Sequence, residues 1–175
     1  MRIKKKIITE RLILREYYPA DAKSFSSLGI SFYQTGKINT TNKTKKYIAN
    51  VNKNKNEFAL AIILKKNNAL IGNMEICHMN WFDFKAGEIA YHIHKRHRKK
   101  GYATEASKGL INYCFKHMKM RKIYADTQPT NIASQKVLKK LGFKLEGRIR
   151  ERRKVKGKWT DELDYGLLRK EWKNR

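Results

Sequence analysis

Residues 88–106 read EIAYHIHKRHRKKGYATEA, and they decide which fold the chain is expected to adopt. Apolar and polar residues alternate at the start, as in a half-buried strand, and a basic loop over residues 98–100 then leads into a small-residue turn and a helix. Amides in the first turn of a helix lack an intrahelical acceptor and lie at the positive end of its dipole, so this arrangement suits an anion. Gly101 and Ala103 would let a ligand approach the backbone closely. Spacing alone leaves two simpler interpretations open, a nucleic-acid patch and a solvated basic loop.

The segments around this stretch predict an α+β fold. Alternation and apolar runs predict strands over residues 7–15, 58–64, 69–79, 88–94 and 122–127, and helical spacing predicts helices over residues 19–29, 44–51, 104–118 and 132–141. Residues 143–153 and 159–168 should form a closing hairpin. Because no repeat or Gly/Pro/Ser-rich linker interrupts the sequence, we expect one domain over residues 1–175, with a mixed central sheet of about six to seven strands and flanking helices.

Charge is the unusual feature of the composition. The 175 residues include 41 Lys and Arg against 15 Asp and Glu, a formal net charge of +26. Such a balance favours acidic partners, such as nucleic acid, phosphorylated cofactors or anionic membranes. The same composition, with 29 Lys, 12 Arg and 13 Asn, would also follow from an AT-rich coding bias. Charge alone therefore selects no partner.

Cysteines and apolar runs exclude several classes of protein. Cys77 and Cys114 are far apart and lack CxxC spacing, so a disulfide framework or zinc site is not expected, and no metal is predicted. No apolar run reaches the 18 or more residues of a membrane helix, and the N-terminus lacks a signal-peptide core. We expect a cytoplasmic protein with no membrane partner.

Motifs in several parts of the chain, in order, resemble the GNAT N-acetyltransferase superfamily. Residues 98–103 match its Q/R-x-x-G-x-G/A signature, and the wording GYATEA over residues 101–106 is similar to the RimJ/RimL-like branch of ribosomal-protein N-terminal acetyltransferases. Further segments resemble that branch: TERLILR (9–15), GEIAY (87–91), NIASQKVLKKLGF (131–143), EGR (146–148) and GKWTD (157–161). The loop differs from the family pattern at one position, where relatives often have Gly and this chain has Lys99. Lysine is less favourable than glycine there if the backbone needs a positive φ.

The resemblance implies acetyl-CoA as co-substrate and a primary amine as acceptor, foremost the N-terminal α-amine of a protein or peptide, joined by direct attack. It also implies a bulge that splays the fourth strand from the fifth, so that pantetheine lies in the gap beside Ile93 and His94 and the pyrophosphate meets the loop amides. The residues expected to bind the cofactor are Ile93, His94, Arg98, Lys99, Lys100, Gly101, Tyr102, Ala103, Thr104, Asn131 and Ser134. Lys136 and Lys139 could reach the 3′-phosphate or simply be solvated.

Catalysis needs a base for the amine and a weak acid for the thiolate. Glu88 is the first candidate base, followed by Glu75 and then by His78, His92 and His94. Many GNAT enzymes place a tyrosine where this chain has Leu138, so Ser134 is the expected acid. The simpler interpretations are a solvent-facing Glu88, a locally bonded Ser134 and an Asn131 that only caps its helix.

Two other functions stay open from the sequence. One is acetylation of a small amine, for example a nucleotide-linked amino sugar, since a strongly positive surface repels polycations. The other is an RNA- or ribosome-binding protein on the same fold, and ribosome contact would also suit an enzyme of ribosomal proteins. Either a monomer or a homodimer is compatible with the sequence. The basic patch of the RNA-binding alternative would be Arg148, Arg150, Arg152, Arg153, Lys154, Lys156 and Lys158.

Overall fold

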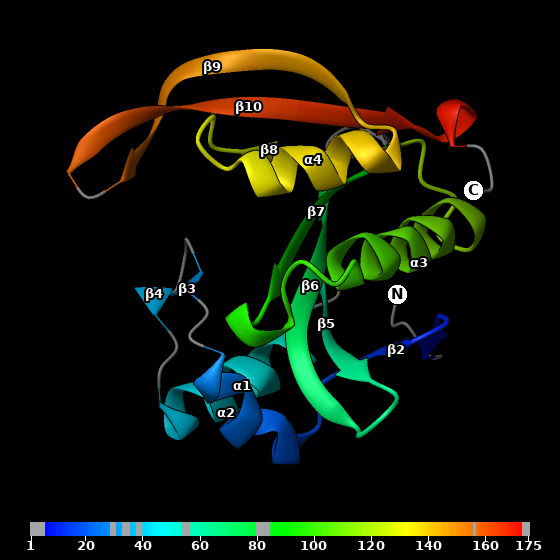
Figure 1. Ribbon diagram of the computed structural model, residues 1–175, viewed down its shortest axis with the longest axis vertical. Helices are drawn as coiled ribbons and strands as arrows, with labels where there is room; N and C mark the ends of the chain where they lie inside the picture. The colour runs from blue at the N-terminus through cyan, green and yellow to red at the C-terminus, as the bar shows by residue number, and fades with distance from the viewer. Residues whose placement is uncertain are drawn as a thin grey trace. The chain divides into compact units, whose positions relative to one another are not determined.

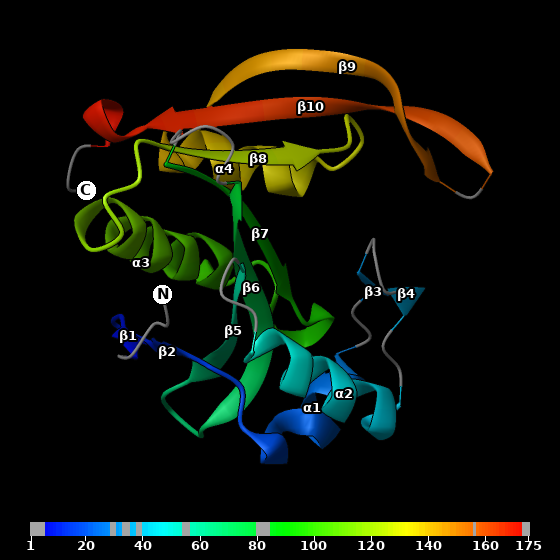
Figure 2. The same cartoon turned by 180° about the vertical axis from the view of Figure 1, so that it is seen from behind.

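The computed structural model describes residues 6–28, 31–32, 36–37, 40–53, 57–79, 85–155 and 157–172. Two compact units make up the chain: Met1–Cys77 with Ala90–Leu110, and His78–Ile89 with Ile111–Arg175. Strand β7 (Ala86–Ile93) and helix α3 (Tyr102–Lys116) each run from one unit into the other (Figures 1 and 2). The sequence also predicts a turn over residues 80–85, of which only Lys85 is among the described residues. No described helix has the length and apolar character needed to cross a membrane.

The first unit is an antiparallel sheet with two helices. Its strands neighbour one another in the order β1 (Ile7–Ile8), β2 (Leu12–Arg15), β5 (Glu57–Leu64), β6 (Ala69–Met79) and the second half of β7. Between β2 and β5 the chain forms a 3-10 turn η1 (Pro19–Asp21), helix α1 (Ala22–Ser27), a small hairpin of β3 (Ser31–Phe32) and β4 (Gly36–Lys37), and helix α2 (Thr41–Val51). Helix α2 starts earlier than predicted, because Thr40 accepts a hydrogen bond from the Lys43 amide as its N-cap.

The first predicted strand is wrong in one respect: residues 7–15 form a tight hairpin of two strands. Ile7 pairs with Leu14 and Ile8 with Ile13. The Thr9 amide donates to the Leu12 carbonyl at 3.0 Å, and the Thr9 hydroxyl accepts from the Leu12 amide at 3.1 Å. Thr9 thus closes a turn through three consecutive polar residues, a local competition with strand structure that threonine favours.

Aromatic side chains hold α1 and α2 to the first unit's sheet. The ring of Tyr17 meets Phe25 edge-on at 5.1 Å, and Phe25 stacks on Tyr47 at 5.5 Å between centroids. Ile48 is buried in the same cluster with Ala59, Ala61 and Ile63 of β5. Such contacts explain why two short helices with a polar sequence are stable here, since packing rather than propensity supplies most helix stability.

The second unit contains the C-terminal elements. Strands lie in the order β7 (its first half), β8 (Lys122–Thr127), β10 (Lys158–Leu168) and β9 (Lys144–Val155), and helix α4 (Ile132–Leu141) connects β8 to β9. A last 3-10 turn, η3 (Arg169–Glu171), follows β10. Strand β8 and helix α4 have the predicted bounds, and Gly142 ends α4 at φ +90° as expected for a left-handed cap.

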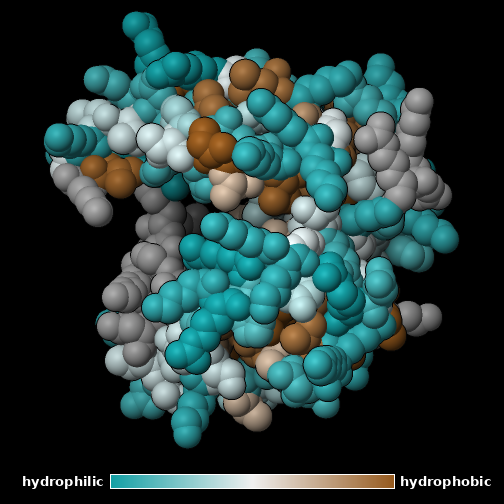
Figure 3. All heavy atoms as spheres, in the orientation of Figure 1, coloured by the Kyte–Doolittle hydropathy of each residue, from teal (hydrophilic) through white to brown (hydrophobic). Residues whose placement is uncertain are grey.

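The two faces of this second sheet differ in chemistry. Ile123, Ala125, Tyr165 and Leu167 are buried on one face, which α4 covers with Leu138 and Leu141 among others. Residues alternate between the two faces along a strand. The residues between these apolar ones, among them Lys122, Asp126 and Glu162, therefore lie on the opposite face and make it polar and charged. Hydrophilic residues also dominate the molecular face drawn in Figure 3, as a chain with 32% charged residues requires.

The ladders join eight strands in the order β1-β2-β5-β6-β7-β8-β10-β9, with only the β7–β8 pair parallel among the pairings described. The mixed sheet and the α+β class are therefore confirmed. The sheet has one or two strands more than predicted, in part because the first predicted strand is a hairpin. The separate β3–β4 pair was not predicted.

Candidate functional site

The basic loop after β7 has the geometry of an anion site. After the short turn η2 (Lys95–His97), Lys99 and Gly101 adopt left-handed backbone conformations, with φ +61° and +81°. Helix α3 then begins at Tyr102, and the Glu105 amide donates to the Gly101 carbonyl at 3.0 Å. The amides of the first helical turn, at residues 102–104, precede this ladder and can point at a ligand. The backbone at Lys99 does need a positive φ, the case in which lysine is less favourable than glycine.

A hydrogen-bond network ties this loop to the N-terminal hairpin. The Glu105 carboxylate accepts from the Thr9 hydroxyl at 2.6 Å, the Arg11 amide at 2.7 Å and the Arg11 Nε at 2.7 Å. Arg11 also donates to the Lys100 carbonyl at 3.1 Å and lies over the ring of Tyr102. Partial burial raises the pKa of Glu105, but the hydrogen bonds from Thr9 and Arg11 outweigh it and lower the pKa overall. Arg11 thus neutralises a carboxylate that would otherwise repel a phosphate at this helix end.

The sequence does not indicate this network. Nothing in the spacing of the TERLILR and GYATEA motifs shows that Thr9 and Arg11 reach Glu105. A weak signal existed, since a carboxylate in the first turn of a helix at an anion site needs a cationic partner elsewhere in the chain.

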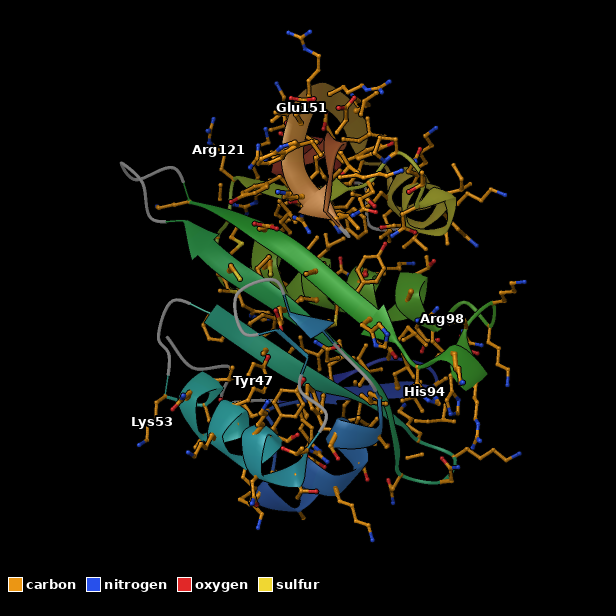
Figure 4. The ribbon with its side chains drawn as sticks, turned by 90° about the vertical axis from the view of Figure 1, so that its left-hand side faces the viewer. Tyr47, Lys53, His94, Arg98, Arg121 and Glu151 are labelled. Atoms are coloured by element: carbon orange, nitrogen blue, oxygen red, sulfur yellow. The ribbon has the colours of Figure 1, made fainter. Side chains whose placement is uncertain are left out.

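The side chain of Arg98 contacts the last two residues of β7. The Arg98 Nε donates to the Ile93 carbonyl at 2.8 Å, and its Nη2 lies 3.1 Å from the Nε2 of His92. The His94 amide donates to the Ile71 carbonyl of β6 at 2.8 Å. Figure 4 shows His94 and Arg98 close together at this end of β7. A ligand that pairs with the backbone here would share the Ile93 carbonyl with Arg98.

His92 is held in its neutral form. Burial, then the charges of Arg98 and His94, lower its pKa to about 4. Because Arg98 has no acceptor atom, it donates to the His92 Nε2, which places the imidazole proton on Nδ1. Among the described residues this buried Nδ1 has no hydrogen-bond partner.

Glu88 lies where the parallel ladder ends. Strands β7 and β8 pair at Ala86–Lys122, Gly87–Ile123 and Glu88–Tyr124, although β8 continues to Thr127. Such a short ladder agrees with the expected splay of this strand pair. Burial, followed by the charge of Asp126, raises the pKa of Glu88 to about 7, with Arg153 opposing. Glu88 is thus half-buried and titrates near neutral pH, unlike the solvent-facing residue of the simpler interpretation.

Three charged side chains lie near Glu88 on the polar face of the second unit's sheet. Arg153 donates through Nη2 to Glu162 at 2.7 Å and to Asp126 at 3.3 Å. The Glu162 side chain is only 2% exposed. The sequence does not indicate this cluster, because its members come from three strands and their register is set by an irregularity in β9.

The first turn of α4 contains the remaining candidates. Asn131 is the N-cap, since its Oδ1 accepts from the Ser134 amide at 3.2 Å. Ser134 is partly buried in that turn. Leu138 is fully buried in the core. Lys136 and Lys139 are exposed on the same helix.

The other candidate bases have different surroundings. The Glu75 Oε1 accepts from the Tyr47 hydroxyl at 2.7 Å and from the Asn73 amide group at 3.3 Å, and Tyr47 extends from α2 (Figure 4). These bonds give Glu75 a role in joining α2 to β6. The side chain of His78 lies outside the described residues. Burial raises the pKa of the Cys114 thiol to about 12, so this thiol does not compete as a nucleophile.

A strand, a basic loop and a helix N-terminus in this order are features that suit the binding of an anion such as a phosphate group. A model of the acetyltransferase (GNAT) domain matches residues 11–144. The chain therefore belongs to the GNAT acetyltransferase family, whose members use acetyl-CoA, and it is an acetyltransferase. This bears out the resemblance read from the motifs.

Relatives and solved structures agree with this assignment. The N-acetyltransferase YnaD of Bacillus subtilis is 32% identical over 170 residues, which cover 95% of this chain and 98% of YnaD. The [ribosomal protein uS5]-alanine N-acetyltransferase of Escherichia coli is 29% identical over 89 residues, 51% of this chain and 46% of that protein. A GNAT-family acetyltransferase from Bacillus anthracis superposes with a TM-score of 0.82 at 27% identity, covering 95% of this chain and 100% of the other.

More distant structures share the fold alone. Mycobacterium smegmatis RimJ in complex with CoA-disulfide has a TM-score of 0.85 at 18% identity, covering 95% of this chain and 88% of RimJ. A chimera of Vibrio cholerae spermidine N-acetyltransferase SpeG has a TM-score of 0.81 at 22% identity, covering 95% and 100%. Neighbours named as a ribosomal-protein-S5-alanine acetyltransferase and as a spermidine acetyltransferase thus share this architecture.

Proposed function

We propose that this acetyltransferase acts on the N-terminal α-amine of a protein or peptide, with Glu88 as general base and Ser134 as general acid. The observation that carries the proposal is the environment of Glu88, whose pKa is raised to about 7. A base with this pKa is about half ionised at pH 7 and is stronger than an ordinary carboxylate.

The lower pKa of its ammonium form makes an α-amine easier for this base to deprotonate than a lysine side chain. An α-ammonium group has a pKa near 8, so transfer of its proton to Glu88 is uphill by about 1 unit, or roughly 1.4 kcal/mol. A lysine ammonium, near 10.4, requires about 3.4 units, or roughly 4.6 kcal/mol. The difference of about 3 kcal/mol is more than a hundredfold in the population of reactive amine.

The bonds would change as follows. Glu88 takes a proton from the ammonium group, and the amine nitrogen attacks the thioester carbon, forming a C–N bond. The tetrahedral intermediate then loses the C–S bond, and the leaving CoA thiolate takes the proton of the Ser134 hydroxyl. The second proton of the attacking nitrogen replaces it, so Ser134 ends neutral, and the proton held by Glu88 passes to solvent. An exposed strand amide near the end of the β7–β8 ladder would stabilise the oxyanion.

The two faces of the second unit's sheet suit this direct attack. Glu88 belongs to the polar face, while α4, which carries Ser134, covers the apolar face and starts soon after β8 ends. If the thioester of acetyl-CoA lies beyond the last β7–β8 pair, the amine would approach it from the polar face beside Glu88. Ser134 would then reach the leaving sulfur from the opposite face, which α4 covers.

Co-substrate binding is assigned to the loop and its surroundings. We infer that the pyrophosphate lies against the loop from Arg98 to Thr104, that pantetheine runs along Ile93 and His94, and that Asn131 contacts the bound acetyl-CoA. Lys99 and Lys100 add charge beside the pyrophosphate, and Arg11 keeps Glu105 from opposing it.

The similarity to the [ribosomal protein uS5]-alanine N-acetyltransferase of Escherichia coli supports a ribosomal-protein acceptor, for which a basic enzyme surface would aid docking on an RNA-rich particle. Pure RNA binding has less support, because three arginines of the expected patch are engaged within the protein. Arg148 pairs with Asp161 at 2.7 Å, while Arg152 and Arg153 pair with Glu162. These pairs reduce the charge that the hairpin offers to phosphates.

The test is release of CoA thiol from acetyl-CoA at physiological salt. Three acceptors are compared: a peptide with a free Ala or Ser N-terminus, the N-blocked peptide containing Lys, and a set of small amines. We expect release with the free N-terminus.

Ser134→Ala should slow turnover more than it weakens acetyl-CoA binding, and equal turnover would remove Ser134 from the mechanism. Release with small amines alone would move the function to metabolite modification, and RNA binding indifferent to acetyl-CoA would favour the non-enzymatic alternative.

A further inference from the structure

Carboxylates from three neighbouring strands share one face of the second unit. Glu88 on β7 pairs with Tyr124 on β8, so Asp126, two residues further along β8, lies on the same face. Asp126 pairs with Asp164 on β10, which places Glu162 on this face as well. Three carboxyl groups thus stand along one polar surface, where the charges of Asp126 and Glu162 favour the protonated form of Glu88.

A bulge in β9 brings two consecutive arginines to this surface. Thr160 pairs with Arg153 and Glu162 pairs with Ile149, so residues 150–152 stand opposite the single residue Asp161. Glu151 has φ +51° at the bend of β9 (Figure 4), and its amide donates to the Asp161 Oδ1 at 3.0 Å. Bulges of this kind redirect side chains and are frequent beside active sites.

The positions of the Arg152 and Arg153 side chains depart from ordinary strand geometry. In a regular strand, consecutive side chains point to opposite faces. Here Arg152 Nε lies 3.4 Å and Arg153 Nη2 lies 2.7 Å from the same Glu162 carboxylate. Because Arg153 also lies 3.3 Å from Asp126, one guanidinium compensates two carboxylates, of which Asp126 is the stronger influence on Glu88.

We propose that Asp126 and Arg153 are positioning residues of the acetyl transfer, acting in opposite senses on the proton of Glu88. Asp126 favours the protonated carboxyl and so strengthens the base, whereas Arg153 favours the ionised form and keeps it available at neutral pH. The β9 bulge, anchored by Asp161, holds Arg153 at the required place. This inference rests on Glu88 as the base of the proposed function.

Other titratable and charged groups lie on the same face as Glu88, on the neighbouring strands. Among the described residues of the second unit, this face carries Lys122, Tyr124 and Asp126 on β8, Glu162 and Asp164 on β10, and Glu146, Arg152 and Arg153 on β9. Lys122 is engaged by Glu146 at 2.5 Å. Asp164 lies 3.8 Å from Arg152 and is more exposed than Glu162. Asp164 is therefore the matched control for Asp126, because it is the same residue type opposite it on the same face.

The experiment is the pH dependence of kcat/KM with a free N-terminal peptide and acetyl-CoA. Asp126→Asn should move the acid limb to lower pH, and Arg153→Gln should move it to higher pH, each by at least about half a pH unit. Asp164→Asn should leave the limb in place. Arg153→Lys, which keeps the charge, should restore most of the wild-type profile. A purely structural role would lower activity without opposite displacements of the limb.

Folding is the main complication for one variant. Arg153→Gln leaves the buried Glu162 without its closest partner, and such losses can prevent folding. The double variant Arg153→Gln/Glu162→Gln removes both charges and keeps hydrogen-bonding groups. Since the Arg153 charge acts on Glu88 more strongly than that of Glu162, the double variant should still move the acid limb to higher pH, by less than the single variant.

A direct titration separates this inference from the proposed function. The carboxyl of Glu88, followed by carbon-13 NMR, should titrate at lower pH in Asp126→Asn than in the wild type, whatever the role of Glu88 in catalysis. An unchanged titration, or limbs that move in the same direction in both variants, overturns the inference. If the NMR shifts appear but Glu88→Gln keeps the wild-type acid limb, the electrostatic coupling stands, while Glu88 as base and the positioning role that depends on it both fall.

Discussion

Arg11 and Glu105, 94 positions apart, form an ion pair of 2.7 Å at the start of α3. Arg11 makes this contact with its side chain and, through its backbone amide, a second one to the same carboxylate. The pair fastens the N-terminal hairpin to the helix whose first turn should receive the pyrophosphate. Removing Arg11 should therefore affect binding of the co-substrate as well as stability.

For Arg11→Gln we expect the KM for acetyl-CoA to rise severalfold, because the Glu105 carboxylate then opposes the phosphates. Stability should fall by only about 1 kcal/mol, since the Arg11 side chain is partly exposed. Steady-state kinetics and thermal unfolding measure the two effects, with Arg11→Lys as the charge-preserving control. An unchanged KM in Arg11→Gln would show that Glu105 does not face the co-substrate.

Lys99 has a backbone conformation that glycine would adopt at less cost. Lys99→Gly should stabilise the free enzyme by about 1 kcal/mol, because a left-handed conformation costs a non-glycine residue about that much. Lys100→Gly removes the same charge at a neighbouring position outside the left-handed region, so it should not stabilise the protein. Both variants should bind acetyl-CoA more weakly. Equal unfolding temperatures for the two variants would contradict the strain at Lys99.

Gly72 lets β6 pass close to the end of β7. A Cβ at this position would overlap the His92 carbonyl oxygen and lie 3.1 Å from the Ile93 side chain. Gly72→Ala should therefore destabilise the protein by about 2–3 kcal/mol and weaken acetyl-CoA binding at Ile93 and His94. Gly147→Ala, with nothing within 4 Å of its Cβ, is the control and should have little effect. Denaturant unfolding compares the two, and similar losses would refute the close approach.

Glu88 and His92 should give opposite pH dependences of stability. The pKa of Glu88 is about 7 in the folded protein against 4.5 ordinarily, so its stabilising contribution is full below pH 4.5 and is lost as pH rises through 7. The pKa of His92 is about 4 against 6.5, so its contribution is present above pH 6.5 and is lost as pH falls toward 4.

Substitutions should reveal these two contributions. Relative to the wild type, Glu88→Gln should gain stability as pH rises from 4.5 to 7, and His92→Gln should gain stability as pH falls from 6.5 to 4. Urea unfolding at several pH values measures both. Parallel curves for wild type and either variant would mean that the group has an ordinary pKa in the folded state.

Local patterns in the sequence predicted most of the fold. The bounds of β8 and α4 follow from a short alternating run and from Asn131 and Gly142 at the helix ends, all of which are local signals. The loop geometry around Gly101 was also predictable. A strand that is joined to a helix by a short turn of small residues allows the backbone of that turn only a few conformations. The hairpin at Thr9 was not, since side-chain hydrogen bonding there overrides alternation.

Contacts between distant segments could not be predicted in the same way. The Arg11–Glu105 pair joins two motifs whose spacing is arbitrary. The approach of Arg153 to Asp126 and Glu162 depends on a register shift in β9, and a shift of register changes which face each side chain occupies. The sequence could name Glu88 as a candidate base, but its raised pKa follows from neighbours that only the folded sheet brings together.

The most direct test of the central claim uses one peptide that contains both a free Ala or Ser N-terminus and an internal Lys. The enzyme is incubated with this peptide and acetyl-CoA at pH 7, and tandem mass spectrometry locates the acetyl group. Acetylation of the α-amine, lost in Glu88→Gln, is the predicted result. Acetylation of the lysine side chain, or of neither amine while small amines react, would contradict the account.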